Sequence, residues 1–326
     1  MKNGKFIISL DFELMWGVHD IESIDSYGDA IIGTRKSLDK MLLCFDTYNI
    51  RVTFATVGFL FHKTKKQLLE NYPSKEPTYS IKKLSPYIGL ENYLGKDEDI
   101  DPYHFAESLI RLIKKYNSHE FATHTYSHYY CLEDGQTITQ FEEDLKLSIA
   151  VAKNNNVELK SIVFPRNQYN EHYIKVCKNY GITSYRGTEK SYIYKSSNGL
   201  KQSLFKRGLR LLDAYINITG YNCYNTDIIK RSIPYNIPSS RFLRPYNKKL
   251  YCLDWLKFLR IKRAMTYAAK KKLVYHLWWH PHNFGRNCKQ NIQFLEKILK
   301  HYKYLNKKYS FESITMSELS NKLKRI

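Results

Sequence analysis

Two acidic residues follow directly after an apolar stretch near the start of the chain, in the segment FIISLDFELMWG. Asp11 and Glu13 are two positions apart, and side chains spaced by two point the same way on a strand. Carboxylates that lie close together repel each other unless a cation is placed between them. The pair therefore requires a cation, and its identity is the first question that the sequence poses.

A second pair of chemically active residues comes from the segment EFATHTYSHYY, which contains His124 and His128. If the chain turns helically here, positions i and i+4 share a face about 6 Å apart, and two imidazoles can then chelate one metal ion. Zinc accepts nitrogen and carboxylate ligands. HxxxH alone is a weak motif, but both pairs follow an apolar strand. A metal between them would leave one acid as a ligand and the other as a base.

Two further strand ends carry polar residues that suit catalysis. The segment SIVFPRNQYN places Arg166 after a strand, and KLVYHLWWHPHNFG places His280 and His282 beside Trp278 and Trp279. A histidine there could protonate a leaving group, and the indoles could stack on a sugar ring. The same residues also allow a purely structural interpretation, with the arginine in an ion pair and the tryptophans in the core.

The elements that must position these residues alternate along the chain. Parallel strands joined by crossover helices are typical of such a pattern. The repeat predicts an α/β fold, a barrel of about seven parallel strands with long inserted loops, whose active site lies at the carboxyl ends of the strands. The expected strands are 5–10, 51–57, 120–124, 161–165, 182–187 and 272–279, and the expected helices are 35–48, 103–116, 138–153 and 170–181.

Two stretches, near 62–102 and 189–250, interrupt the alternation of strands and helices. We expect them to be insertions in a single domain spanning 1–326. The second stretch contains the amphipathic segment FKRGLRLLDAYI. Such a segment either packs on the barrel as a crossover helix or contacts a membrane surface.

The net charge of +21 allows nucleic acid, an anionic membrane face or a polyanionic substrate as partner, although the basic runs also fit solvated helix faces. The six cysteines form no CxxC pair, and the N-terminal residues do not read as a signal peptide. These features favour free thiols and a cytoplasmic protein, with a location at the inner membrane face as a further option.

The segments SLDFE, VTFATVGF, ATHTYSH, FPRN and WWHPHNFG, in this order, resemble those of the NodB-homology polysaccharide deacetylases. The resemblance covers nearly the whole chain, and within the family it is nearest to a subgroup associated with surface-polysaccharide biosynthesis. It implies a distorted (β/α) barrel and one divalent metal ion, with Zn²⁺ the first expectation.

The resemblance also implies a role for each motif residue. Asp11 falls on the catalytic base, Arg166 on the arginine that orients this base, and His280 on the general acid, with His282 close enough to compete. The metal ligands would be Glu13, His124 and His128.

The sequence departs from the family pattern in two places. Phe12 separates two acids that are usually adjacent, and the chain continues from Arg166 as Asn-Gln-Tyr, where the family has a proline two residues after the arginine. The second departure puts the backbone donor of the oxyanion hole in doubt.

The resulting expectation is a metal-dependent carbohydrate deacetylase that acts on a linear amide, the N-acyl group of an amino sugar in a surface-glycan precursor. The precursor would be lipid-linked or nucleotide-linked, and nucleic acid is not expected as a partner. The residues expected to bind substrate are Trp278, Trp279, His282, Arg241 and Arg244. Two alternatives stay open: amide or imide hydrolysis of a small molecule on the same barrel, and an inactive barrel that binds polyanions.

Overall fold

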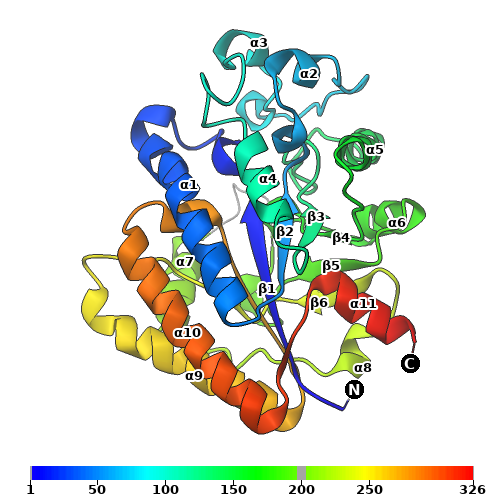
Figure 1. Cartoon of the computed structure of the whole chain (residues 1–326). Coiled ribbons are helices and arrows are strands. Elements are labelled where there is room, and N and C mark those ends of the chain that lie inside the picture. Colours follow the sequence, from blue (N-terminus) through cyan, green and yellow to red (C-terminus); the bar gives the residue numbers. More distant parts are fainter. Residues whose placement is uncertain (1, 197–202, 326) are drawn as a thin grey trace.

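A sheet of parallel strands runs through the centre of the molecule, and helices cover its outside (Figure 1). The computed structural model describes residues 2–196 and 203–325. Each of the six strands predicted from the sequence overlaps an observed strand. The strands are β1 (Lys5–Phe12), β2 (Val52–Thr56), β3 (Glu120–Thr123), β4 (Ser161–Ile162), β5 (Ser184–Gly187), β6 (Tyr235–Pro238), β7 (Arg241–Phe242), β8 (Val274–Trp279) and β9 (Glu312–Ser313).

The strand order is β6-β5-β4-β3-β2-β1-β8-β7, and β9 adds to β1. Every pair in this path is parallel. All eight residues of β1 are buried, as expected for a parallel strand with covered faces. In this register Asp11 lies opposite Ala55 of β2, and Leu10 lies opposite Trp279 of β8. The carboxyl ends of β1, β2, β3 and β8 therefore meet at one edge.

One extended segment joins the two edges of the sheet. Its first part, β6, pairs with β5, and its second part, β7, pairs with β8. Between them the Ser239 amide donates to the Gly187 carbonyl at 2.8 Å, and the Ser240 amide donates to the His276 carbonyl at 2.8 Å. The sheet therefore closes on itself through this segment, and the distorted (β/α) barrel expected from the sequence is confirmed.

The stretch 189–250 is more regular than we expected, because it supplies both β6 and β7 to the sheet. Its sequence, RSIPYNIPSSRF, reads as a loop because prolines flank a very short apolar strand. The stretch 62–102 is mostly irregular, and Figure 1 shows its helices α2 (Lys65–Leu69) and α3 (Leu90–Tyr93) beyond the carboxyl end of β1.

The outer helices bury apolar stripes against the sheet. Helix α1 begins at a capping box formed by Ser23 and Ser26, and α5 at one formed by Thr137 and Gln140. None of the helices among the described residues combines the length and hydrophobicity needed to cross a membrane. In addition to α2 and α3, the α-helices of the described residues are α1 (Ile24–Thr47), α4 (Glu107–Lys114), α5 (Ile138–Asn154), α6 (Glu171–Asn179), α7 (Leu204–Asp213), α8 (Thr226–Ile229), α9 (Asp254–Lys271), α10 (Cys288–Tyr309) and α11 (Met316–Lys324).

Candidate active site and metal centre

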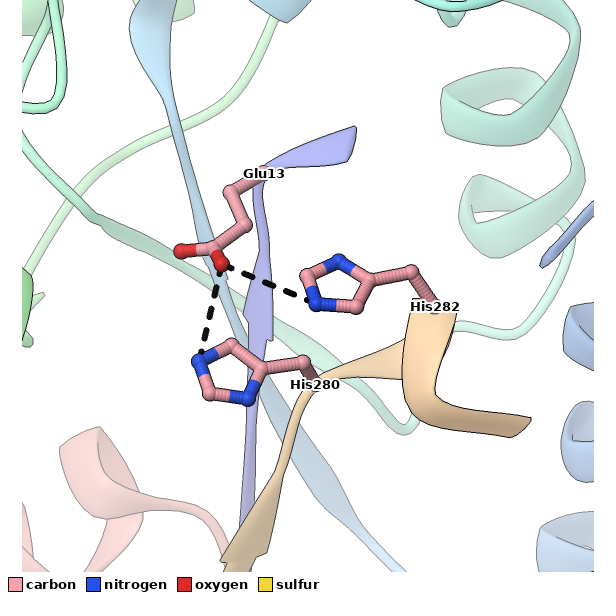
Figure 2. A group of neighbouring side chains, drawn as sticks. All are labelled: Glu13, His280 and His282. Atoms are coloured by element: carbon pink, nitrogen blue, oxygen red, sulfur yellow. Dashed lines mark ion pairs between the residues drawn. The ribbon is translucent and has the colours of Figure 1, made fainter. Parts of the chain in front are cut away.

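The carboxylate of Glu13 is the meeting point of four histidines that come from two strand ends. One oxygen, Oε2, lies 3.1 Å from Nε2 of His124 and 3.2 Å from Nε2 of His128. The other, Oε1, lies 3.5 Å from Nε2 of His280 and 4.0 Å from Nε2 of His282. Figure 2 shows the second pair pointing at the carboxylate from the segment after β8. The residues predicted to bind the metal are therefore brought together.

Two overlapping groups of side chains could hold a metal ion: Glu13 with His124 and His128, and Glu13 with His280 and His282. In each group the ligand atoms lie within 4.8 Å of one another. The first group is fully buried, whereas His280 in the second is partly exposed. The first group therefore has the enclosed ligands expected of a bound ion, and the second leaves a histidine that solvent and substrate can reach.

The hydrogen bonds of His124 leave its Nε2 as the nitrogen that faces Glu13. His124 donates from Nδ1 to the carbonyl of Val163 at 2.8 Å, and a carbonyl can only accept, so Nδ1 carries a proton. Nε2 of His124 lies 3.1 Å from the Glu13 carboxylate. A neutral imidazole with its proton on Nδ1 can offer Nε2 to a metal ion, and this set of carboxylate and imidazole donors fits zinc.

His128 is oriented by a chain of contacts that leads away from the centre. Its Nδ1 lies 3.2 Å from the hydroxyl of Tyr130, which donates to Asp20 at 3.1 Å. Because the hydroxyl donates to Asp20, it accepts from Nδ1, and Nε2 of His128 is again free to bind a metal. Arg166 pairs with the same Asp20 and stacks on the Tyr130 ring, with its guanidinium 4.1 Å from the ring centroid.

The segment between the two ligands differs from the expected helical turn. Residues 124–130 form an irregular loop, in which Thr125 and His128 have positive φ angles of 64° and 59°. The buried carboxylate of Asp144, on α5, accepts hydrogen bonds from the amides of Tyr126 at 2.7 Å and Ser127 at 3.0 Å. The rest of the protein holds this strained loop, and Asp144 is a positioning residue that the sequence patterns did not reveal.

Both acids are ionised when the protein is folded. Burial alone would raise the pKa of Glu13, but the neighbouring His280, His124 and His128 hold it well below its usual value. Burial likewise acts to raise the pKa of Asp11, but the Arg186 guanidinium leaves it below the usual value. Asp11 is therefore an unprotonated carboxylate and can act as a base.

Arg186, on β5, is the arginine that binds the expected base. Its two terminal nitrogens donate to the two oxygens of Asp11 at 2.6 and 2.7 Å, and Nη1 also donates to Ser9 at 3.0 Å. The guanidinium is 1% exposed and lies 4.0 Å from the centroid of the Trp278 indole. An arginine inside the predicted strand ITSYRG was the signal that could have identified it, because a buried arginine needs an acidic partner.

The resemblance implied that Arg166 contacts Asp11, but in the structure Arg186 makes this contact. Arg166 follows β4, where its nearest acids are Asp20 and Glu133, the latter at 3.7 Å. The reason is that Arg186 occupies the space beside Asp11, with its terminal nitrogens on both carboxylate oxygens. The structure thus places Arg166 behind the candidate ligand His128 instead of behind the candidate base.

The two tryptophans at the end of β8 point to opposite sides of the sheet. Trp279 is 0% exposed and packs in the core beside Phe45 and Phe284, so the expectation that it binds substrate is wrong. Adjacent residues of a strand point to opposite faces, so only one of the pair can face the site. Trp278 is that residue, since its ring contacts His280 and lines a cavity.

His280 and His282 differ in access. Nε2 of His280 lies 3.7 Å from Asp11 Oδ2 and 3.5 Å from Glu13 Oε1, and its side chain is 24% exposed. His282 is buried against Tyr27, and burial with the charge of His280 lowers its pKa to about 3. An acid that protonates a leaving group must reach it while charged, which favours His280.

Arg241 and Arg244, expected to bind substrate, line a cavity of about 200 Å³ next to His280 and Trp278. Arg241 is buried and pairs with Asp213 at 2.7 Å, and Arg244 is half-buried. Neither position caps a helix: Arg241 begins β7, and Arg244 follows it. The cavity opens beside the candidate acid, so both arginines are near the site.

No family model and no curated protein matches the sequence. Solved structures do match. A candidate polysaccharide deacetylase from Mycobacterium smegmatis is 14% identical with a TM-score of 0.58, over 100% of this chain and 92% of that one. A candidate polysaccharide deacetylase from Pseudomonas aeruginosa PAO1 is 10% identical with a TM-score of 0.53, over 98% and 90%. Puue allantoinase is 9% identical with a TM-score of 0.50, over 97% and 88%.

These similarities establish the fold. The chain has the barrel that these deacetylases and this allantoinase share, and the resemblance to polysaccharide deacetylases is confirmed at that level.

Proposed function

We propose that the protein is a metal-dependent hydrolase that removes an N-acyl group, in the first place acetyl, from an amino sugar. The observation that carries the proposal is the arrangement around Glu13. Two histidines place their Nε2 atoms against this carboxylate, while a separate carboxylate, Asp11, is held by Arg186 and lies 3.7 Å from a partly exposed histidine. A metal centre, a base and an acid thus occupy one strand edge.

The metal would be held by Glu13, His124 and His128, and Zn²⁺ is the ion that these ligands suit best. When bound, such an ion polarises the acyl carbonyl and lowers the pKa of water.

The protein's own side chains move the protons. Asp11 accepts a proton from the water that attacks the acyl carbon, and Arg186 keeps both of its oxygens in place during that step. His280 donates a proton from Nε2 to the sugar nitrogen as the carbon–nitrogen bond breaks. The products are a carboxylic acid and a free amine. An amide needs this acid because an unprotonated amine is a poor leaving group, so the histidine favours N-acyl over O-acyl substrates.

A carbohydrate substrate is favoured over a small cyclic amide by the surroundings of the site. Trp278 and the cavity beside His280 extend the site well beyond the reacting atoms. The allantoinase match shows that the fold also occurs in a protein named for a small-molecule activity, and we therefore include allantoin among the test substrates. A surface-glycan precursor inside the cell is the substrate context that we propose.

We also propose that helix α7 contacts a membrane. Its apolar residues are exposed: Leu204 by 78%, Phe205 by 73% and Leu212 by 51%. The alternative of a helix that packs its apolar face on the barrel is not supported by such exposure. Vesicles containing anionic lipid should sediment the wild type but release a Phe205→Ser, Leu212→Ser variant. The matched control is Leu43→Ser on α1, which removes a leucine of 61% exposure elsewhere.

The proposed function is tested by metal content and acetate release measured together. The wild type should hold about one equivalent of zinc and release acetate from N-acetylated sugars. His124→Ala should lose both properties, whereas His172→Ala, an exposed histidine on α6, should lose neither.

Asp11→Asn separates chemistry from metal binding. It should keep the metal and lower kcat by about 10² or more, because it removes only the base. A wild type that binds no zinc, or an Asp11→Asn variant with full activity, would contradict the proposal. Steeply salt-dependent polyanion binding without metal or hydrolysis would instead support an inactive barrel.

A further inference from the structure

The cavity beside the candidate acid is strongly basic. Its lining includes Lys206 and Arg210 from α7, Arg241 from β7, and Arg244 just after β7. Glu189 is the only carboxylate among the described residues that line it. Burial raises the pKa of Glu189, which accepts a hydrogen bond from Ser239 at 3.0 Å. The lining therefore carries more positive charge than the single carboxylate of Glu189 can balance.

Arg241 is fixed in place but keeps unused donors. Its Nη1 donates to the Asp213 carboxylate at 2.7 Å and to the Asp213 carbonyl at 2.9 Å. Its Nη2 has no hydrogen-bond partner among the described residues, although the side chain is only 5% exposed. A buried N–H group without an acceptor costs about 1–3 kcal/mol, so such groups are usually found where a ligand supplies the acceptor.

Arg244 adds a charge without an acidic partner. Within residues 2–196 and 203–325 it forms no ion pair, and its pKa is lowered by burial and then by the charges of Arg210 and Arg241. Arginines that repel one another at a half-buried site are stabilised when an anion binds between them. Lys206, whose ammonium lies 3.9 Å from the centroid of the Tyr192 ring, is a further cation that lines the same cavity.

We propose that this cavity is a phosphate subsite, and that the substrate is an N-acylated amino sugar that carries a phosphate or pyrophosphate. The inference rests on the proposed function, because it places the sugar between His280 and the arginines. A phosphate carries up to two charges and several acceptor oxygens, which several guanidinium groups can share. A single carboxylate brings only one charge and two acceptor oxygens, which is less than a phosphate offers to this basic lining.

The phosphate has two natural sources, a nucleotide-linked sugar and a lipid-linked sugar. Both present the same group to Arg241 and Arg244, so the subsite chemistry is common to them. The exposed apolar residues of α7 lie on the helix that also supplies Lys206 and Arg210 to the cavity. A lipid chain attached to the phosphate would therefore leave the cavity beside an apolar surface.

The test compares binding of N-acetylglucosamine 1-phosphate and of N-acetylglucosamine to the zinc-loaded protein by calorimetry. The wild type should bind the phosphorylated sugar at least tenfold more tightly. Arg244→Gln and Lys206→Gln should each reduce this preference severalfold, and the double variant should abolish it. Arg263→Gln, which removes an exposed arginine of α9, should leave it unchanged. Arg241 is not substituted, because Asp213 would lose its partner and the fold could be affected.

Equal binding of the two sugars by the wild type, or full preference in the double variant, would overturn the subsite. Binding and acetate release are separate measurements, so the two proposals fail separately. A protein that prefers the phosphorylated sugar but releases no acetate keeps the subsite and loses the proposed function. A protein that hydrolyses both sugars with equal kcat/KM keeps the function and loses the subsite. The same calorimetry is then repeated with UDP-N-acetylglucosamine and with a sugar linked to a short prenyl pyrophosphate. The ligand that binds more tightly identifies the source of the phosphate as nucleotide or lipid.

Discussion

Two arginine-to-lysine substitutions should separate metal binding from catalysis. Arg186→Lys should lower kcat and leave zinc affinity nearly unchanged, whereas Arg166→Lys should lower zinc affinity and leave kcat nearly unchanged. Arg186 donates to Asp11 at 2.6 and 2.7 Å, whereas Arg166 reaches the metal ligand His128 only through Asp20 and Tyr130. Arg186→Lys keeps the charge beside the base but cannot span both of its oxygens, since lysine has a single nitrogen. Arg166→Lys keeps a charge near Asp20 but loses the planar stack on the Tyr130 ring.

The expected magnitudes follow from these contacts. A hydrogen bond to a charged group contributes about 1.5–3 kcal/mol, so losing one bond from Arg186 should lower kcat by roughly 10- to 100-fold. Zinc affinity should stay within about threefold, because Arg186 contacts none of Glu13, His124 and His128. Arg166→Lys should weaken zinc affinity by about 10- to 100-fold, as loss of a group that orients a ligand does. Its kcat at saturating zinc should change by less than about threefold.

The assay is zinc competition with a chromophoric chelator, followed by acetate release at saturating zinc, with circular dichroism to confirm folding. The two variants control for each other, since both are arginine-to-lysine changes at buried or half-buried sites near one centre. The reverse pattern, with lower kcat for Arg166→Lys and lower zinc affinity for Arg186→Lys, would refute the assigned roles. It would return Arg166 to the position beside the base that its motif implies.

Three further predictions concern a glycine beside Glu13, the loop that carries His124 and His128, and a histidine just before β3. A Cβ at Gly17 would lie 2.0 Å from the Glu13 carboxylate, so Gly17→Ala should weaken zinc affinity at least tenfold, whereas Gly208→Ala, in open space on α7, should leave it unchanged in a zinc titration. Asp144→Asn should lower the free energy of unfolding in urea by about 2 kcal/mol, because Asp144 holds the amides of the ligand loop. Burial lowers the pKa of His119 from 6.5 to about 4, so the unfolded chain takes up a proton first as pH falls, and stability is lost between pH 6.5 and 4. His119→Phe should reduce the fall in unfolding free energy between pH 7 and 5 by about 1 kcal/mol, and an unchanged pH profile would contradict this assignment.

The sequence predicted that the central residues lie together, because each of them lies at or just after the end of a predicted strand. Asp11, Glu13, His124 and His280 are fixed by where β1, β3 and β8 end, and parallel strands end at one edge. For these residues the local sequence pattern is sufficient to predict where they lie in the fold. It was not sufficient for Arg186, which lies inside a strand and whose partner is 175 residues away along the chain.

The predictions that failed depended on which face or which neighbour a side chain has. Trp278 and Trp279 look equivalent in the sequence, and only the register of β8 against β1 decides that the second is buried. The short strands β6 and β7 were missed because they are held by pairing with β5 and β8, and their own residues give no strong strand pattern.

The central position of β1 has a consequence for the order in which the protein can fold. As the earliest strand of this sheet in chain order, β1 pairs with β2, but its other partners are β8 and β9, at residues 274–279 and 312–313. Contacts between such distant residues form late, because a long loop must close first. Until residues 274–279 have left the ribosome, one edge of β1 stays unpaired and can pair with other chains. Chaperone binding to nascent chains should therefore persist until β8 emerges, and a late-folding barrel of this kind should be sensitive to substitutions that weaken the pairing of β8 with β1.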